Sequence, residues 1–84
     1  MNLKLVIYSR ANCHLCKEAE RDVREVLTEI NFELEIIYID GNTELESLYG
    51  EEVPVVFING AKYDYFRVDK LRLAKTIFSL IHGD

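Results

Sequence analysis

The two cysteines of this chain, Cys13 and Cys16, are separated by two residues and stand where one hydrophobic pattern gives way to another. The run before them, residues 3–8, is short and aliphatic and is typical of a buried strand. From residue 13 to residue 30, apolar residues recur at intervals of three and four, the period of an amphipathic helix. This junction predicts that the cysteine pair occupies the start of a helix that directly follows a strand.

The predicted helix has two distinct faces, and Asn12 is its expected N-cap. The apolar face carries Cys16, Ala19, Val23, Val26, Leu27 and Ile30. The charged face carries Lys17, Glu18, Arg21, Asp22, Glu25 and Glu29. Cys16 is therefore expected on the packed side of the helix, about one turn deeper than Cys13.

The segment after this helix predicts a strand and a second, short helix. Residues 32–39 open with alternation and end continuously apolar, which favours a strand. Thr43 is the expected cap of a short helix that continues to Tyr49 and ends at Gly50. The residues of this helix that are expected to face inward are Leu45, Leu48 and Tyr49.

The remaining residues predict a hairpin followed by a last helix. Residues 53–58 and 61–66 are rich in strand-forming side chains, and Asn59-Gly60 between them is a strong hairpin signal. The last helix is expected to run from Asp69, its cap, to Ile81. Its inner face is expected to carry Leu71, Ala74, Ile77, Phe78 and Ile81.

The order βαβαββα predicts an α/β fold with a four-stranded mixed sheet flanked by helices on both faces. A strand, a helix and a strand in succession form a right-handed unit with parallel strands, and the hairpin supplies the antiparallel half of the sheet. A chain of 84 residues has room for one core, so residues 1–84 are expected to form a single domain.

The formal net charge of −5 limits the partners that the chain is expected to bind. A negative surface repels nucleic acid and anionic membranes, so neither is an expected partner. The apolar run at the N-terminus is too short for a secretory signal, and no segment reaches the length of a membrane span. A cytoplasmic location is expected, where a cysteine pair is more often catalytic or metal-binding than a permanent disulfide.

A cysteine at the start of a helix is well placed to act as a nucleophile. The attacking species is the thiolate, and the ordinary pKa of cysteine is about 8.5. A helix N-terminus offers unpaired N–H groups and about half a positive charge, which favours the anion of Cys13. Arg10 and His14 are the cations expected to lower its pKa further. Cys16 is expected to be the resolving thiol.

Three other interpretations of the cysteine pair stay open. A structural zinc site needs four ligands, and the chain offers only His14 and His82 besides the pair, so zinc would require a dimer that shares two pairs. A structural disulfide that closes so short a loop would constrain the unfolded chain very little. The third interpretation is that both cysteines are inert core residues. The expected position of Cys13 at the start of the helix argues against it.

Three motifs, taken in order, resemble those of a known family. They are Cys13-His14-Leu15-Cys16 after the first strand, Val53-Pro54 before the third strand and Asn59-Gly60 in the hairpin. Together they resemble a glutaredoxin-like protein of the thioredoxin-fold superfamily, over nearly the whole chain. The resemblance implies a thioredoxin-like, glutaredoxin-type fold in which Pro54 follows a cis bond and packs beside the cysteines. It also implies that the backbone N–H and C=O of Val53, held extended before proline, bind the substrate.

The chain departs from the glutaredoxin pattern in three places. His14 and Leu15 stand where glutaredoxins generally carry proline and tyrosine. Many glutaredoxins hold the charged end of glutathione with two glycines and an aspartate, but here the stretch 65–69 lacks glycine, and its candidate binding residues are Arg67 and Asp69. Thioredoxins place a buried aspartate six residues before the first cysteine, where this chain has Ile7, and this difference favours the glutaredoxin side.

These observations lead to one main hypothesis and two alternatives. The main hypothesis is a monomeric thiol–disulfide oxidoreductase that uses the redox-active pair Cys13 and Cys16 to reduce protein or glutathione mixed disulfides. It needs no bound cofactor; glutathione is the candidate co-substrate, and a reductase or glutathione is the expected electron donor. The first alternative is a redox-sensitive binding or sensing module with little turnover. The second is a dimer that carries a metal ion or an iron–sulfur cluster.

Overall fold

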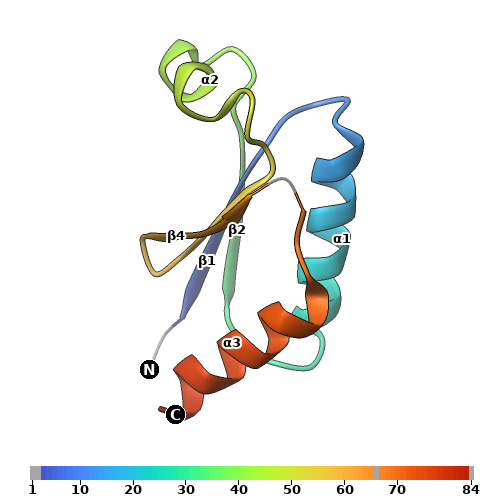
Figure 1. Cartoon of the computed structure of the whole chain (residues 1–84), viewed down its shortest axis with the longest axis vertical. Coiled ribbons are helices and arrows are strands. Elements are labelled where there is room, and N and C mark those ends of the chain that lie inside the picture. The colour runs from blue at the N-terminus through green and yellow to red at the C-terminus, as the bar shows by residue number, and fades with distance from the viewer. Residues whose placement is uncertain (1–2, 66, 84) are drawn as a thin grey trace.

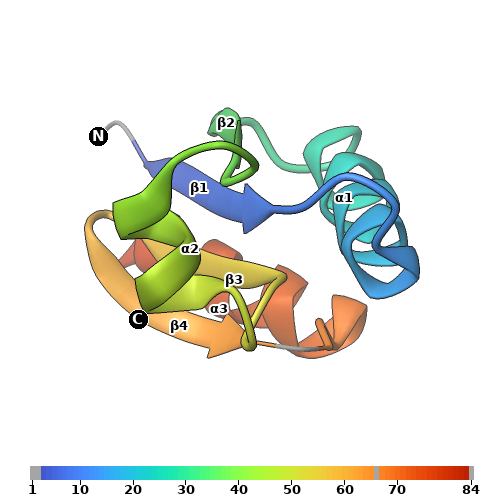
Figure 2. The ribbon, with the colours of Figure 1, turned by 90° about the horizontal axis from the view of Figure 1, so that it is seen from above.

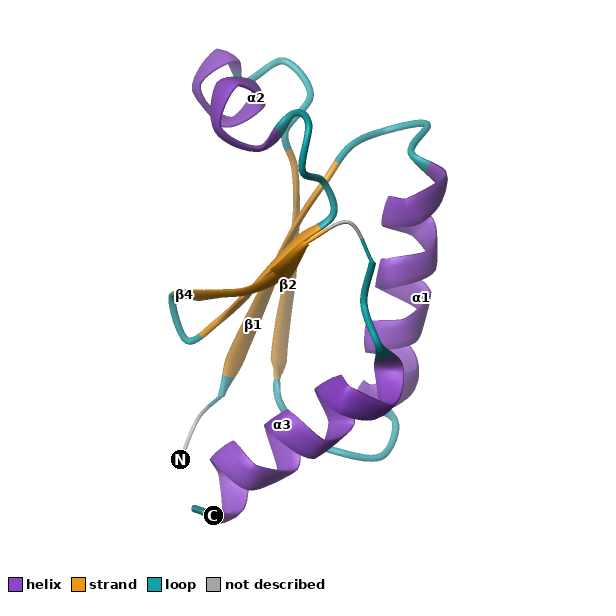
Figure 3. Cartoon of the chain, viewed as in Figure 1, coloured by secondary structure: helices purple, strands orange, loops and turns teal. Residues whose placement is uncertain are grey.

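The computed structural model describes residues 3–65 and 67–83. Its elements are β1 (Lys4–Ser9), α1 (His14–Leu27), β2 (Glu33–Tyr38), α2 (Thr43–Tyr49), β3 (Val55–Ile58), β4 (Ala61–Tyr65) and α3 (Lys70–His82). This order confirms the predicted βαβαββα arrangement (Figure 3). Phe66, which the sequence assigned to the fourth strand, lies outside the described residues. Within the described ranges, no helix combines the length and the apolar character needed to span a membrane.

The four strands form one mixed sheet in the order β2-β1-β3-β4. β1 pairs in parallel with β2 and antiparallel with β3, and β3 pairs antiparallel with β4. α1 and α3 lie together on one side of the sheet (Figure 1). α2 stands at the end of the sheet from which the loop to α1 leaves, on the side away from α1 (Figures 1 and 2). The start of α1 and the end of α2 therefore belong to the same end of the molecule.

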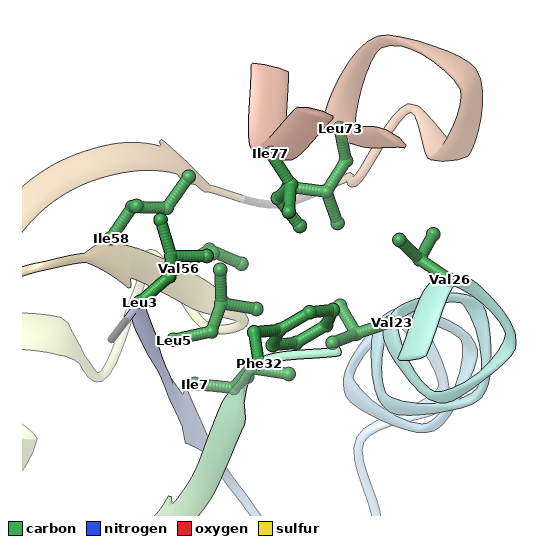
Figure 4. Close-up of a cluster of buried hydrophobic side chains, with 10 residues drawn as sticks. All are labelled: Leu3, Leu5, Ile7, Val23, Val26, Phe32, Val56, Ile58, Leu73 and Ile77. Atoms are coloured by element: carbon green, nitrogen blue, oxygen red, sulfur yellow. The ribbon is translucent and has the colours of Figure 1, made fainter. Parts of the chain in front are cut away.

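The larger hydrophobic core fills the space between the sheet and the two helices α1 and α3 (Figure 4). Its buried members are Leu3, Leu5, Ile7, Val23, Val26, Phe32, Val56, Ile58, Leu73 and Ile77. Alternate residues of β1 enter this core, because successive side chains of a strand point to opposite faces. Each large aliphatic side chain contributes about 1.5–3 kcal/mol when it is fully buried. This layer holds α1, which carries the cysteines, against the sheet.

The buried face of α3 differs from the predicted one. Leu73 and Ile77 are fully buried, whereas Leu71 and Phe78, which were predicted to face inward, are 75% and 52% exposed. Two other predicted residues pack partly against the core: Ala74 and Ile81. The helix carries neighbouring apolar stripes, and its orientation on the sheet decides which of them is buried.

This choice of face predicts unequal costs for two leucine substitutions on the same helix. Leu73→Ala should lower the free energy of unfolding by about 2–5 kcal/mol, because it leaves a cavity in the core. Leu71→Ala should change it by less than about 0.5 kcal/mol, because that side chain already faces solvent. Urea unfolding of the two variants measures the difference, and similar losses would contradict this packing of α3.

The short helix α2 also differs in detail from the sequence prediction. Asn42 rather than Thr43 is its N-cap, and Oδ1 of Asn42 accepts a hydrogen bond from the backbone N–H of Leu45 at 3.0 Å. Leu48 is 56% exposed although it was predicted to face inward. A seven-residue helix at the end of the sheet has one covered side, and here Leu45 and Tyr49 occupy it.

The hairpin turn at Asn59-Gly60 is confirmed. Both residues have positive φ, 50° for Asn59 and 85° for Gly60, as the favoured two-residue hairpin turn requires. The side-chain Oδ1 of Asn59 also accepts a hydrogen bond from the backbone N–H of Lys4 at 2.9 Å. The turn is thereby tied to the beginning of β1.

Candidate active site

Cys13 is the N-cap of α1, the position at which a helix presents its unpaired N–H groups. Its backbone is extended, with φ −105° and ψ 111°, and its Sγ accepts a hydrogen bond from the backbone N–H of Cys16 at 3.2 Å. The prediction that Asn12 is the cap was wrong, because Asn12 has a φ of 60° and adopts the left-handed conformation. The sulfur of Cys13 itself therefore lies at the positive end of the helix dipole.

Cys16 lies one turn into α1 and has no exposed surface. It packs with Ile39 and Val53 in a second, smaller hydrophobic cluster, against which Cys13 packs partly. Burial, followed by the hydrogen bond with the Cys13 side chain, raises the pKa of the Cys16 thiol to about 12, while a hydrogen bond from the Arg10 backbone acts in the opposite direction. Cys16 is therefore held as a neutral thiol near neutral pH.

Among the described residues, two long-range hydrogen bonds tie the loop between β1 and α1 to distant parts of the chain. The guanidinium Nη1 of Arg10 donates a hydrogen bond to the carbonyl oxygen of Gly50, at the end of α2, at 3.2 Å. The backbone N–H of Ala11 donates to Oδ2 of Asp40 at 2.9 Å. A Cβ at position 50 would lie 2.4 Å from the carbonyl oxygen of Glu46 and 3.3 Å from Nη2 of Arg10, so glycine is needed there. Sequence reasoning missed both ties.

His14 begins α1, and its side chain is 88% exposed. Its Nε2 lies 3.3 Å from Oε2 of Glu18, one turn further along the helix. Of the two predicted modulators of the Cys13 pKa, Arg10 thus contacts the end of α2 and His14 contacts Glu18. Within residues 3–65 and 67–83, no hydrogen bond joins either side chain to the sulfur of Cys13. Their modulating role stays a prediction.

Val53 and Pro54 are buried, and the peptide bond between them is cis. Val53 belongs to the same buried cluster as Cys16, so the structure brings this predicted substrate-binding pair to the cysteines. The backbone N–H of Val53 donates to the carbonyl oxygen of Tyr49 at 3.0 Å, in the turn that follows α2. The expectation that this N–H is free for substrate was therefore wrong. The carbonyl oxygen of Val53 accepts no hydrogen bond from the described part of the chain.

The two predicted flanking residues lie between β4 and α3. Arg67 lines a small pocket whose other walls are Leu15, Glu18, Ala19, Asp22 and Val68. Because Leu15 stands between the two cysteines in the sequence, this pocket adjoins the cysteine motif. Asp69 is the N-cap of α3, as predicted, and its Oδ1 accepts a hydrogen bond from the backbone N–H of Arg72 at 3.1 Å.

Two polar side chains behind the cysteines were missed by sequence reasoning. Glu20 is only 7% exposed, although it is a charged residue of an amphipathic helix. The hydroxyl of Tyr38, on β2, lies 3.2 and 3.3 Å from the two carboxylate oxygens of Glu20 and donates to them. The sequence feature that could have indicated the burial of Glu20 is its spacing: it follows Cys16 by four residues and so lies beside Cys16 on a helix.

The two thiols are suited to different chemical tasks. Both are free, but Cys13 is partly exposed at a helix N-terminus and Cys16 is buried with a raised pKa. A partly exposed sulfur at a helix N-terminus has surroundings typical of a reactive cysteine. A buried sulfur with a raised pKa has surroundings typical of an inert thiol, which reacts only with a group brought next to it. In the described ranges, no three His, Cys, Asp or Glu side chains are grouped so that they could hold a metal ion.

A cysteine pair that opens α1, a Val-Pro pair before β3 and a sheet in the order β2-β1-β3-β4 together define a thioredoxin-fold protein. A mutant thioredoxin from Halobacterium salinarum shares this fold with a TM-score of 0.70, covering 93% of this chain and 74% of that one at 23% identity. Within this class, the family model described as Glutaredoxin-like domain (DUF836) matches residues 4–78. The chain belongs to this glutaredoxin-like family.

Proteins of higher sequence identity come from three bacteria. A Nitrosomonas europaea protein solved by NMR is 35% identical, with a TM-score of 0.76 over 92% of this chain and 93% of that one. An X. campestris protein solved by X-ray methods is 28% identical, with a TM-score of 0.75 over 89% of this chain and 96% of that one. An uncharacterized protein of Mycobacterium tuberculosis is 30% identical over 76 residues, which are 84% of this chain and 78% of the relative.

Proposed function

We propose that this protein is a thiol–disulfide oxidoreductase in which Cys13 attacks and Cys16 resolves. The Cys13 thiolate attacks one sulfur of a substrate disulfide, so that a Cys13 mixed disulfide forms and the first substrate thiolate leaves. Cys16 then attacks the Cys13 sulfur, the Cys13–Cys16 disulfide forms, and the second substrate thiolate leaves. Two electrons from glutathione or a reductase reopen the pair.

The observation that carries this proposal is the unlike surroundings of the two thiols. The sulfur of Cys13 accepts the Cys16 N–H at the helix end, which favours a negative charge there. The sulfur of Cys16 is fully buried, and its pKa is raised to about 12. External disulfides can therefore reach the sulfur of Cys13 but not that of Cys16, and Cys16 can react once a disulfide has formed beside it.

For the substrate, we propose a protein disulfide or a mixed disulfide with glutathione. The carbonyl oxygen of Val53 offers an acceptor to a peptide N–H next to the cysteines. The guanidinium of Arg67 offers a partner to a substrate carboxylate, although Glu18 and Asp22 line the same pocket and reduce its attraction for anions. A pocket lined by one cation and two carboxylates favours a substrate that carries both a positive and a negative charge over one that is only negative.

Trapping of the mixed disulfide tests the proposed division of roles. Cys16→Ser keeps the attacking thiol and removes the resolving one, so incubation with glutathione disulfide should leave one glutathione on Cys13. Mass spectrometry of the intact protein and of its peptides measures the adduct and its position. Cys13→Ser is the matched control and should acquire none at neutral pH.

Two outcomes would contradict the proposal. Absence of an adduct on Cys13 with glutathione disulfide and with a disulfide-bonded peptide would remove the oxidoreductase function. An adduct that forms in Cys16→Ser, together with wild-type protein that never turns over, would instead favour the redox-sensitive binding module.

A further inference from the structure

The carboxylate of Glu20 is buried on the packed side of α1, where Cys16, Ala19 and Val23 are its buried neighbours along the helix. Burying a charged group is costly unless polar partners compensate for the lost water. The Tyr38 hydroxyl donates to both of its oxygens, at 3.2 and 3.3 Å, and Nη1 of Arg24 lies 3.9 Å from Oε1. The attack by Cys13 and the bond between the two sulfurs do not themselves involve this buried carboxylate.

Cys16 is one helical turn away from Glu20 on the same buried face. The two groups interact electrostatically, since the negative charge of Glu20 is one of the causes that raise the pKa of Cys16. In the resolving step, Cys16 must lose its proton while it attacks the Cys13 sulfur. Because Cys16 has no exposed surface, water cannot take this proton directly.

Glu20 also faces solvent on its other side. It lines a surface pocket together with Arg10, Ala11, Asn12, Lys17, Tyr38 and Asp40. The loop that leads to Cys13 and Tyr38, the last residue of β2, form two of its walls. Glu20 therefore borders both the buried surroundings of Cys16 and a pocket that is open to water, which is the position that a proton relay requires.

We propose that Glu20 accepts the proton of Cys16 in the resolving step and passes it to solvent through this pocket. The assignment rests on the proposed oxidoreductase function. As the Cys16 sulfur bonds to the Cys13 sulfur, its proton moves to the Glu20 carboxylate and the substrate thiolate leaves with the electron pair of the broken S–S bond. The protonated Glu20 then releases the proton to water in the pocket.

The groups that face Glu20 suit this role. Arg24 lies 3.9 Å from the Glu20 carboxylate. The cations Lys17 and Arg10 line the pocket, and Asp40 is its second carboxylate. Tyr38 stays a donor, because the negative charge of Glu20 raises the pKa of its hydroxyl. The carboxylate is therefore held in place by a group that does not compete with it for the proton.

Glu20→Gln tests the relay, because glutamine keeps an acceptor for Tyr38 and cannot take a proton. The probe is a symmetric aromatic disulfide whose thiolate product is coloured, mixed with reduced protein in a stopped-flow instrument. The first equivalent of colour reports attack by Cys13, and the second reports resolution by Cys16. In Glu20→Gln the first phase should be unchanged, and the second should slow by about 10²-fold at neutral pH.

Whether the second phase slows or speeds up in Glu20→Gln distinguishes a relay from a purely electrostatic effect, because the charge of Glu20 also disfavours the Cys16 thiolate. If Glu20 acted by its charge alone, its removal would make Cys16 easier to ionise and would speed the second phase. An equal or faster second phase in Glu20→Gln therefore overturns the relay. Glu25→Gln makes the same change of charge on the exposed face of α1 and should leave both phases unchanged.

The pH profile of the wild-type protein provides a test that needs no variant. If Glu20 takes the proton, the rate of the second phase should rise much less steeply with pH than the fraction of Cys16 thiolate does. Without a relay, it should rise about tenfold per pH unit, in step with the Cys16 thiolate, and that result would also overturn the proposal. Absence of the first phase in the wild-type protein would instead refute the oxidoreductase function itself.

Discussion

Replacement of Cys13 by serine is expected to lower the rate of disulfide reduction by at least about 10³-fold, because the attacking sulfur is lost. The other thiol cannot substitute for it, since Cys16 is fully buried and its pKa is raised to about 12. The measurement is the turnover of a disulfide-bonded peptide or of glutathione disulfide with an excess of reductant. A variant that kept more than a tenth of the wild-type rate would show that Cys13 is not the nucleophile.

Serine is the appropriate replacement because of where Cys13 stands in α1. The side chain at this position caps the helix by accepting the Cys16 N–H. Serine is among the best N-cap residues, so Cys13→Ser should keep the fold, whereas alanine would remove the cap at a cost of about 1 kcal/mol. Circular dichroism and urea unfolding of the serine variant separate a loss of chemistry from a loss of structure.

In the same Cys13→Ser protein, Cys16 is expected to react with iodoacetamide at least about tenfold more slowly than an exposed cysteine at about pH 8. Burial disfavours the Cys16 thiolate in this variant too, although the contribution of the Cys13 side chain to the raised pKa is lost. Burial is the largest cause of the raised pKa, and it persists when Cys13 becomes serine. The labelling rate should rise about tenfold per pH unit for as long as the Cys16 thiol is mostly protonated.

Unfolding provides the control for this slow reaction. In concentrated urea, Cys16 should react at the rate of an ordinary thiol, because water then reaches the sulfur. Rapid labelling of the folded variant at about pH 8 would contradict the burial of Cys16.

The raised pKa of Cys16 in the wild-type protein also makes its stability depend on pH. The unfolded chain loses the Cys16 proton above about pH 9, whereas the folded chain keeps it until about pH 12, so the folded state loses stability as the pH rises through this window.

The sequence predicted the fold through features that are local in the chain. The change from an aliphatic run to a helical period at Cys13 located β1 and α1, and Asn59-Gly60 located the hairpin. The inner face of α3 was not predictable in this way. Leu71 and Leu73 are equally apolar, and the approach of the helix to the sheet decides between them.

In the candidate site too, local motifs were predictable from the sequence and long-range contacts were not. The cysteine pair and Val53-Pro54 are readable as short motifs, and the structure places both in one cluster. The contacts of the loop before Cys13 join residues that are 29 and 40 positions apart, so no local pattern indicates them. The buried position of Glu20 likewise depends on β2, whose Tyr38 lies against α1.

The two hydrogen bonds that tie the loop before α1 determine how much of the chain would have to be moved to rebuild this site in another scaffold. A graft of residues 10–16 alone would carry the sulfurs but not their anchors, because Arg10 is held by the carbonyl of Gly50 and Ala11 by the carboxylate of Asp40. A designer would have to move three separate stretches of chain and keep their spacing in the host. The candidate site is thus discontinuous in the chain, although its cysteine motif is four residues long.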